Sequence, residues 1–358
     1  MTTTTSSVVV KIGTSSVTDE RGGIAHEVLD AVAADVVALR HEGWSTVVVT
    51  SGAITAGWAD VGGGRARPTD AATLQAVSAV GQPLLMDAWR QSFARLQVTV
   101  GQVLLAPLDF SHRGQYLHAR STLSALSALG VVAIINENDA VADEEIRFGD
   151  NDRLAALVAN LVTASHLVLL TDTPGLLTAD PRLDPTARLI DVVTSIDDGL
   201  EGVAGRSRSG VGSGGMASKV AAARMATWSG VTTVIAPARE STPLRRALSG
   251  TRDFGTTFEP RADRLSARKA WIAFAVASSG TLRVNAGALN ALEHDGRSLL
   301  RVGVESYEGD FFEGDAVEIM GPTGELVAKG LVRANAESFA ESDDVVVHRD
   351  DLVLLRHD

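Results

Sequence analysis

The sequence predicts two domains: an α/β domain built on a mostly parallel sheet, followed by a smaller β-rich domain. The length of 358 residues, 45% of them hydrophobic, is ample for about two domains of about 150 residues each. Through the first 236 residues, short β-branched runs alternate with amphipathic segments, a pattern typical of an α/β fold. After Ala277 the pattern changes to short strands broken by glycine and aspartate, which indicates a separate domain of about 80 residues.

The strands expected in the first domain are continuous apolar runs, as in parallel strands that are buried on both faces. They are Val8–Ile12, Thr46–Thr50, Val98–Leu105, Val131–Ile135, His166–Thr171 and Val231–Ala236. Between these strands, apolar residues recur with the period of a helix. We therefore expect helices at Ala25–His41, Ala71–Arg95, Gly114–Leu129, Asp152–Ala164 and Met216–Ser229.

The second domain is predicted from short strands separated by turn residues. These strands are Thr281–Val284, Leu300–Val304, Ala316–Met320, Leu326–Val332 and Val345–Val347. Before them, from Pro237 to about Arg268, the sequence shows no clear periodicity beyond one short helix. We therefore expect the α/β domain at residues 1–262, a linker at 263–276 and the second domain at 277–358.

Composition excludes several classes of protein. The chain has no cysteine, so disulfide frameworks, thiol catalysis and cysteine-ligated metal sites are excluded, and its 8 histidines show no metal-ligand spacing. No signal peptide and no apolar run long enough to span a membrane are visible, so we expect a cytoplasmic protein without a membrane partner. The net charge is −12, of which −9 falls after Ala277, and this acidity argues against a nucleic-acid partner.

Small polar loops follow most strands of the first domain, and in open α/β sheets ligands bind at the carboxyl ends of the strands. Ordinary turn and helix-cap chemistry explains any one such loop. The set as a whole contains two of the four lysines in the chain, which points to a ligand site. The loops are Lys11–Ser15, Thr50–Ala53, Asn136–Asp139, Gly149–Asp152, Thr171–Gly175 and Gly210–Lys219.

The glycine-rich segment before Lys219 admits several interpretations. It is not a Walker A loop, because Met216 stands where the lysine is required, and a dinucleotide site is weakly indicated because no strand precedes it. A glycine loop that enters a helix beside an ammonium group is also a general phosphate site. Lys11 could supply a second ammonium group, with Asp152 as the carboxylate that holds both lysines. This combination favours phosphoryl transfer.

Six motifs resemble those of the glutamate 5-kinases, a branch of the amino acid kinase family that carries a C-terminal PUA domain. The resemblance covers nearly the whole chain, and the order of the motifs is specific to this branch. The matching segments are VVVKIGTS (Val8–Ser15), VVVTSGAI (Val47–Ile54), INENDAV (Ile135–Val141), FGDNDRLAALVA (Phe148–Ala159), LLTDTPGLLTADPR (Leu169–Arg182) and GSGGMASKV (Gly212–Val220).

The resemblance implies an amino acid kinase fold, an open and mostly parallel eight-stranded sheet between helical layers, joined to a small β-rich PUA-like domain. The implied reaction is ATP-dependent phosphorylation of the side-chain carboxylate of L-glutamate, with Mg²⁺, to L-glutamyl 5-phosphate, the first step of proline biosynthesis. Proline as a feedback inhibitor and a homo-oligomer, a dimer or a tetramer, are also implied.

The family's functional residues match positions of this chain. Lys11 and Lys219 would be catalytic, with Asp152 organising them. The nucleotide would contact Lys11, Thr171, Asp172, Ser213, Gly214, Gly215, Met216, Ala217, Ser218 and Lys219. Glutamate would contact Ser51, Gly52, Asn136, Asp139 and Asn151. The chemistry agrees, because an ammonium group needs a carboxylate such as Asp139 while carboxylates need N–H and hydroxyl donors.

Two alternatives stay open at this point. Kinases for acetylglutamate, aspartate, carbamate or a phosphorylated isoprenoid alcohol share the fold, and PUA domains elsewhere bind RNA. The segment Arg333–His348 is short for the family, so the PUA-like domain is expected to be trimmed.

Overall fold

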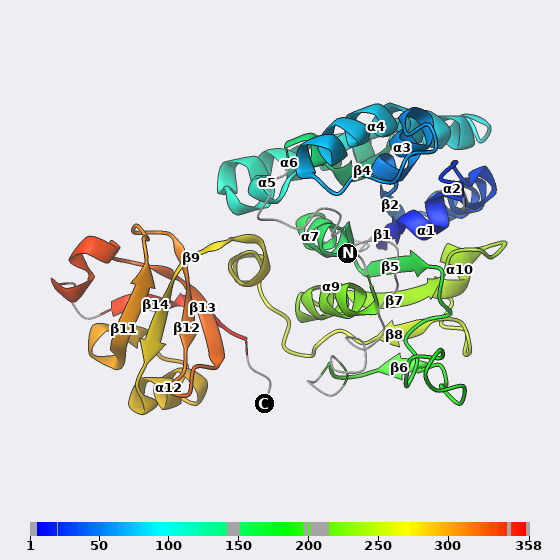
Figure 1. The fold of residues 1–358 in the computed structure, drawn as a ribbon. Coiled ribbons are helices and arrows are strands. Elements are labelled where there is room, and N and C mark those ends of the chain that lie inside the picture. The colour runs from blue at the N-terminus through cyan, green and yellow to red at the C-terminus, as the bar shows by residue number, and fades with distance from the viewer. Residues whose placement is uncertain are drawn as a thin grey trace. The chain divides into compact units, whose positions relative to one another are not determined.

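A computed structural model describes residues 6–19, 21–141, 151–196, 200, 215–341 and 345–355. The chain forms two compact units, residues 1–109 with 114–264, and residues 110–113 with 265–358 (Figure 1). The expected boundaries at residues 262 and 277 stay a prediction. None of the helices among the described residues is long and apolar enough to cross a membrane.

The first unit is built on an eight-stranded sheet in the order β3-β4-β2-β1-β5-β7-β8-β6. Every neighbouring pair is parallel except β7 and β8, so the predicted open and mostly parallel sheet is confirmed. The two short strands β6 and β8 were not expected, because a strand of two or three residues is too short to show a periodic sequence pattern. The strands are β1 Ser7–Ile12, β2 Ser45–Val49, β3 Val100–Leu105, β4 Val132–Glu137, β5 His166–Thr171, β6 Val192–Val193, β7 Thr232–Pro237 and β8 Thr256–Phe258.

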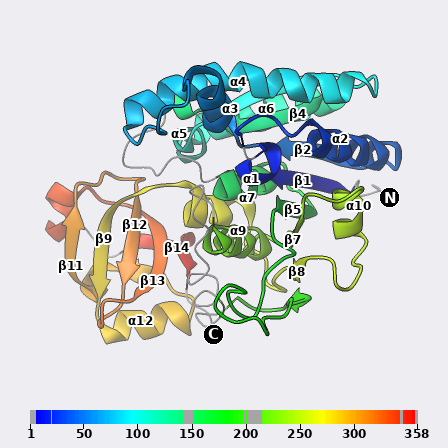
Figure 2. The ribbon, with the colours of Figure 1, turned by 45° about the vertical axis from the view of Figure 1, so that its right-hand side comes forward.

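Helices cover this sheet, and Figure 2 shows α4 and α3 beside the end of the sheet that contains β4. The five expected helices are present as α2, α4, α6, α7 and α9. Helix α3 was not expected, because its nine residues contain a glycine and follow a loop motif. The elements are α1 Thr14–Val17, α2 His26–His41, α3 Ala53–Val61, α4 Ala71–Ala94, α5 Pro107–Ser111, α6 Arg113–Ala128, η1 Asp139–Val141, α7 Asn151–Leu161, α9 Met216–Trp228 and α10 Pro243–Leu248.

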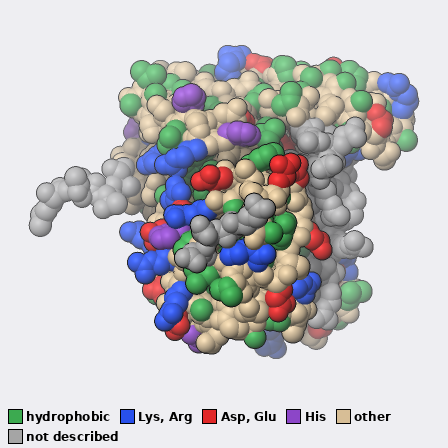
Figure 3. All heavy atoms as spheres, turned by 90° about the vertical axis from the view of Figure 1, so that its left-hand side faces the viewer, with side chains coloured by type: hydrophobic (Ala, Val, Ile, Leu, Met, Phe, Trp, Pro, Cys, Tyr) green, Lys and Arg blue, Asp and Glu red, His purple; other side chains and the backbone are tan. Residues whose placement is uncertain are grey.

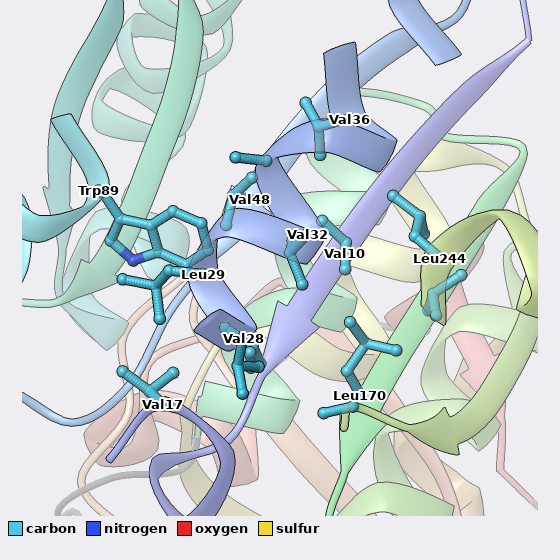
Figure 4. Packing of buried hydrophobic residues seen from close by; sticks show 14 of the residues in the cluster. Val10, Val17, Val28, Leu29, Val32, Val36, Val48, Trp89, Leu170 and Leu244 are labelled. Atoms are coloured by element: carbon cyan, nitrogen blue, oxygen red, sulfur yellow. The ribbon is translucent and has the colours of Figure 1, made fainter. Parts of the chain in front are cut away.

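The core of the first unit lies between α2, α4 and the central strands (Figure 4). Helix α2 turns Leu29, Val32 and Val36 toward Val10 of β1, and all four side chains are fully buried. The indole of Trp89 on α4 is also fully buried in this cluster. The 3.6-residue period of apolar residues in α2 is therefore explained by its position over the sheet.

Helices α3 and α4 cross with their backbones in contact. A β-carbon added to Gly57 of α3 would lie 2.1 Å from the carbonyl oxygen of Val77, and one added to Gly81 of α4 would lie 1.8 Å from that of Ala53. Only glycine fits at these two positions, and the crossing therefore fixes α4 relative to the loop that precedes α3. That loop contains Ser51 and Gly52.

The Gly81→Ala variant should be less stable than the wild type by about 1–3 kcal/mol or more, because the new methyl group overlaps the α3 backbone. Gly114→Ala is the matched control: Gly114 lies in α6, and no atom lies within 4 Å of the place that a β-carbon would take there. This control should be neutral or more stable by about 0.5–1 kcal/mol. Urea unfolding of both variants measures the difference; equal stabilities would contradict the close crossing.

The second unit contains a six-stranded sheet in the order β10-β14-β13-β12-β9-β11. Its elements are α11 Ala267–Ala270, η2 Trp271–Ala275, β9 Ser278–Val284, α12 Ala286–Glu293, β10 Leu299–Leu300, η3 Arg301–Gly303, β11 Val304–Gly309, β12 Ala316–Met320, β13 Leu326–Val332, η4 Ala336–Glu341 and β14 Val345–Leu354. The aromatic rings of Tyr307, Phe311 and Phe339 pack together in its core.

The expected strand Leu300–Val304 was wrong in one respect. The chain forms a 3-10 turn at Arg301–Gly303, between β10 and β11. These two strands lie at opposite edges of the sheet although only three residues separate them, so the sheet must curl. The guanidinium of Arg301 holds this corner by donating to the carbonyl oxygens of Phe339 and Val304, each at 3.1 Å.

Candidate active site

The candidate site lies at the carboxyl ends of the central strands. From β1 the chain proceeds to β2 on one side, while β5 and β7 lie on the other side. Such a reversal of strand order opens a crevice for ligands beyond the strand ends. Four of the six loops predicted to bind ligands follow β1, β2, β4 and β5, so these four reach this edge. The other two, Gly149–Asp152 and Gly210–Lys219, precede α7 and α9 and lie partly outside the described residues.

Two lysines meet one carboxylate at this edge. The Nζ atom of Lys11, on β1, lies 2.7 Å from Oδ1 of Asp152, and the Nζ atom of Lys219, on α9, lies 3.2 Å from Oδ2. Ser218 donates a hydrogen bond of 2.8 Å to the same Oδ2. Lys11 and Lys219 are 4% and 5% exposed, and the carboxylate of Asp152 is fully buried. The cluster therefore places two ammonium groups in a site nearly closed to water.

The charge of this cluster is fixed by its geometry. Burial would raise the pKa of the Asp152 carboxyl, but the ammonium groups of Lys11 and Lys219 outweigh burial, and hydrogen bonds from Lys11 and Ser218 add to them. The pKa is therefore held well below its usual range. Among the described residues, this cluster has two ammonium groups and one carboxylate, so these side chains can attract an anionic ligand such as a phosphate.

Helix α9 brings Lys219 to Asp152 because it packs against α7, whose first turn contains Asp152. Gly215 precedes α9 and has no side chain to cap it, and Met216, Ala217 and Ser218 form its first turn with Lys219. The predicted nucleotide-loop residues Ser213 and Gly214 lie outside the described residues.

A second polar cluster follows β4. Ser78 of α4 donates a hydrogen bond of 2.7 Å to Oδ2 of Asp139, and Asn136 donates one of 2.7 Å from Nδ2 to Oε1 of Gln82, one turn further along α4. Ser78, Gln82 and Asp139 line a pocket of about 510 Å³ between α4, β3 and the end of β4. Burial raises the pKa of Asp139, and the hydrogen bond from Ser78 opposes that rise.

Three buried amide oxygens accept no hydrogen bond among the described residues: Oδ1 of Asn136, Asn151 and Asn160. The first two belong to the residues predicted to contact glutamate, and they are 2% and 5% exposed. A buried polar atom without a partner is costly, so each favours a ligand that carries a donor. Asn151 is adjacent to Asp152 on α7. Asn151 therefore places one of the residues predicted to contact glutamate next to the lysine cluster.

The remaining predicted residues also lie at this edge. Ser51 is buried at the end of β2, and Gly52, with φ of +107°, turns the chain into α3. Thr171, at the end of β5, donates a hydrogen bond of 3.1 Å to the carboxylate of exposed Asp172. Among the residues that the structure describes, no cluster of three or more His, Cys, Asp or Glu side chains could hold a metal ion.

Sequence reasoning did not include Ser78 and Gln82. They lie in the middle of a helix, about sixty residues before the side chains that they contact, where they form no motif. Their i, i+4 spacing on α4 is a signal that gains meaning once α4 is placed against the end of β4.

Family models match most of the chain. The amino acid kinase family matches residues 6–236. The chain belongs to the amino acid kinase family. The PUA domain matches residues 280–349, so the predicted combination of an amino acid kinase domain with a PUA domain is confirmed.

Within the amino acid kinase family, this member is similar to glutamate 5-kinases along nearly its whole length. It is 46% identical to the glutamate 5-kinase of Rhodococcus opacus over 361 residues, which cover 98% of this chain and 97% of that relative. The glutamate 5-kinase of Halorhodospira halophila is 45% identical over 329 residues, 92% of this chain and 87% of that relative.

A solved structure shares the kinase fold. Carbamate kinase from Giardia lamblia bound to AMP-PNP superimposes with a TM-score of 0.52 at 15% identity, over 72% of this chain and 99% of that chain. At this identity the likeness concerns the fold of the amino acid kinase family alone.

Proposed function

We propose that this chain transfers the γ-phosphoryl group of ATP to the side-chain carboxylate of L-glutamate, which gives L-glutamyl 5-phosphate and ADP. One observation carries the proposal: the buried ammonium groups of Lys11 and Lys219 share Asp152, whose neighbour Asn151 has a buried amide oxygen with no partner among the described residues. The similarity to glutamate 5-kinases supports the choice of substrate.

The two lysines act on the phosphates. An ammonium group near the transferred phosphoryl group stabilises the negative charge that develops on its oxygens and on the leaving ADP. The Asp152 carboxylate holds both ammonium groups before ATP arrives, so little reorganisation is needed. The N-terminus of α9, uncapped by Gly215, suits a phosphate as well. No general base is required, because the attacking carboxylate is ionised at neutral pH.

Glutamate is recognised by the polar cluster after β4. Its ammonium group has three donors, and we assign them to the carboxylate of Asp139 and the amide oxygen of Asn136. Its carboxylates would accept hydrogen bonds from Ser51, the backbone of Gly52 and the Nδ2 group of Asn151, whose Oδ1 atom would in turn accept a hydrogen bond from the glutamate ammonium group. Thr171 and Asp172, at the next strand end, would contact the nucleotide.

Further features follow from the assignment as proposals. Mg²⁺ would be held through the phosphate oxygens of ATP, where it would supply positive charge. The protein acts in the cytoplasm as a dimer or tetramer that proline inhibits. The kinase reaction belongs to residues 1–262, with 263–276 as a linker to the PUA domain.

We do not propose RNA binding for the second unit. Its sequence after Ala277 carries a net charge of −9, which would repel phosphates. On the face displayed in Figure 3, basic and acidic side chains are interspersed with hydrophobic ones.

A hydroxylamine trap for acyl phosphates tests the proposed reaction. The protein is incubated with ATP, Mg²⁺ and, separately, glutamate, acetylglutamate, aspartate and carbamate. Hydroxamate should form with glutamate at a kcat/KM well above that for the other acids. A preference for another acid, or ATP hydrolysis without a trapped product, would refute the assignment.

Asp139→Ala should act mainly on glutamate. We expect its KM to rise by an amount that corresponds to about 2–5 kcal/mol, because the buried ammonium group loses its counter-charge. The KM for ATP should be nearly unchanged. Asp60→Ala, at an exposed position on α3, is the matched control and should leave both KM values as they are. An equal loss of ATP affinity in Asp139→Ala would reassign Asp139 to folding or to the nucleotide.

A further inference from the structure

The glutamate site depends on a helix that carries no recognised motif. We propose that Ser78 of α4 is a positioning residue, whose hydroxyl holds the carboxylate of Asp139 as the partner of the substrate ammonium group. This inference rests on the proposed function, since it assigns Asp139 to glutamate.

Helix α4 contacts three strand-end groups through one of its faces. Ser78 donates to Asp139, Gln82 accepts from Asn136, and the indole N–H of Trp89 donates to Oγ1 of Thr50 at 3.1 Å. Ser78 and Trp89 are eleven residues apart, which is about three helical turns, so the three side chains lie on the same side of α4. The helix therefore serves as a common support for the loops after β2 and β4.

The position of this support is fixed independently of the hydrogen bonds. Gly81 lies between Ser78 and Gln82, and its close approach to the α3 backbone leaves no room for α4 to move toward α3. Helix α3 begins directly after Ser51 and Gly52. The crossing thereby couples the place of Ser78 to the loop that would bind the carboxylates of glutamate.

Asp139 needs the hydroxyl because it is buried. The residue is 6% exposed, and among the described residues Ser78 is the one hydrogen-bond donor to its carboxylate. Burial raises the pKa of Asp139, and the hydrogen bond from Ser78 lowers it. Three other charged groups line the same pocket, Glu137 from β4 and Asp87 with Arg90 from α4. The guanidinium of Arg90 is paired with Asp87, so it does not take the place of the hydroxyl.

Ser78→Ala removes the hydroxyl and little else. We expect the KM for glutamate to rise about 10- to 100-fold, the range for a hydrogen bond to a charged group, while the KM for ATP stays the same. The acidic limb of kcat/KM for glutamate against pH should move to higher pH, because Asp139 loses a bond that favours its ionised form. Ser78→Cys has a weaker donor of similar size, so its KM for glutamate and its acidic limb should lie between those of the wild type and those of Ser78→Ala.

Ser92→Ala is the matched control. Ser92 lies on the same helix, is 2% exposed, and its hydroxyl has no partner among the described residues. The same substitution there should leave both KM values and the pH profile unchanged. A second arm uses Asp139→Asn, in which Ser78→Ala should add little to the KM for glutamate, because Ser78 acts through Asp139.

The outcomes separate this inference from the proposed function. If the wild-type protein forms no glutamate-dependent acyl phosphate, the proposed function fails. If wild type and Ser92→Ala are active and Ser78→Ala has their KM and pH profile, this inference alone is overturned. An equal effect of Ser78→Ala with and without Asp139→Asn also overturns it. If Ser78→Ala does not fold, Ser78→Cys is measured in its place. A KM for glutamate and an acidic limb equal to those of the wild type would then overturn the proposal.

Discussion

Lys219→Ala should lower kcat by about tenfold to a thousandfold, with a smaller effect on the KM for glutamate. The range corresponds to about 1.4–4 kcal/mol of transition-state stabilisation. The ammonium group lies 3.2 Å from the Asp152 carboxylate in a nearly water-free site, where its charge is poorly screened. Steady-state kinetics with the hydroxylamine trap measure the change.

Two further lysine variants sharpen this test. Lys219→Arg should recover little activity, because a planar guanidinium does not replace a compact ammonium group in a buried site. Lys269→Ala is the matched control, since Lys269 lies on α11 of the second unit and belongs to none of the predicted site motifs. Wild-type kcat in Lys219→Ala would refute the phosphate role of Lys219.

Asp152→Asn should have the largest effect on stability. The variant removes the buried negative charge that the ammonium groups of Lys11 and Lys219 share, and breaking a buried ion pair in this way costs about 3–5 kcal/mol. Because Asn has nearly the same shape as Asp, the loss in the free energy of unfolding reports the removal of the charge. Urea unfolding at neutral pH measures it, and the same variant should also show a reduced kcat.

The pH dependence of this loss has a definite sign. Because the pKa of Asp152 is lowered in the folded protein, its contribution is complete above the ordinary carboxyl range, at about pH 4, and declines as the pH falls toward the lowered value. The difference between wild type and Asp152→Asn should therefore shrink only in strong acid. Asp30→Asn is the control, because Asp30 pairs with Arg95 at an exposed position and should cost less than about 1 kcal/mol. Equal losses in both variants would contradict a buried role for Asp152.

Much of the fold could be predicted because the hydrophobic pattern of most segments matches the burial that each segment has in the folded protein. The strands Ala316–Met320 and Leu326–Val332 were expected with the bounds that the structure has, because each is a short run bounded by turn residues. Strand Val345–Leu354 was expected only in its first three residues. Its later part contains four consecutive polar residues, which do not have the apolar pattern of a buried strand. They are His348, Arg349, Asp350 and Asp351.

The sequence by itself determined the class of fold, the order of the central strands along the chain and the loops that carry the chemistry. Each of these depends on residues close in sequence: apolar runs make strands, and Lys11 or Asp152 lies next to the strand or helix end that presents it. The pairing of Lys11 and Lys219 on Asp152 was a hypothesis from motif and resemblance, to which the structure gives distances.

The tertiary structure alone decided which distant side chains support the site. Ser78 and Gln82 are sixty-one and fifty-four residues away from their partners Asp139 and Asn136, and no local period encodes such a pair. Their places follow from the crossing of α3 and α4 at Gly57 and Gly81, where the absence of two side chains lets the backbones touch. A hydrogen bond of this kind depends on how helices pack in three dimensions. Helix packing depends on the side chains of both helices, so the residue pattern of one segment does not predict it.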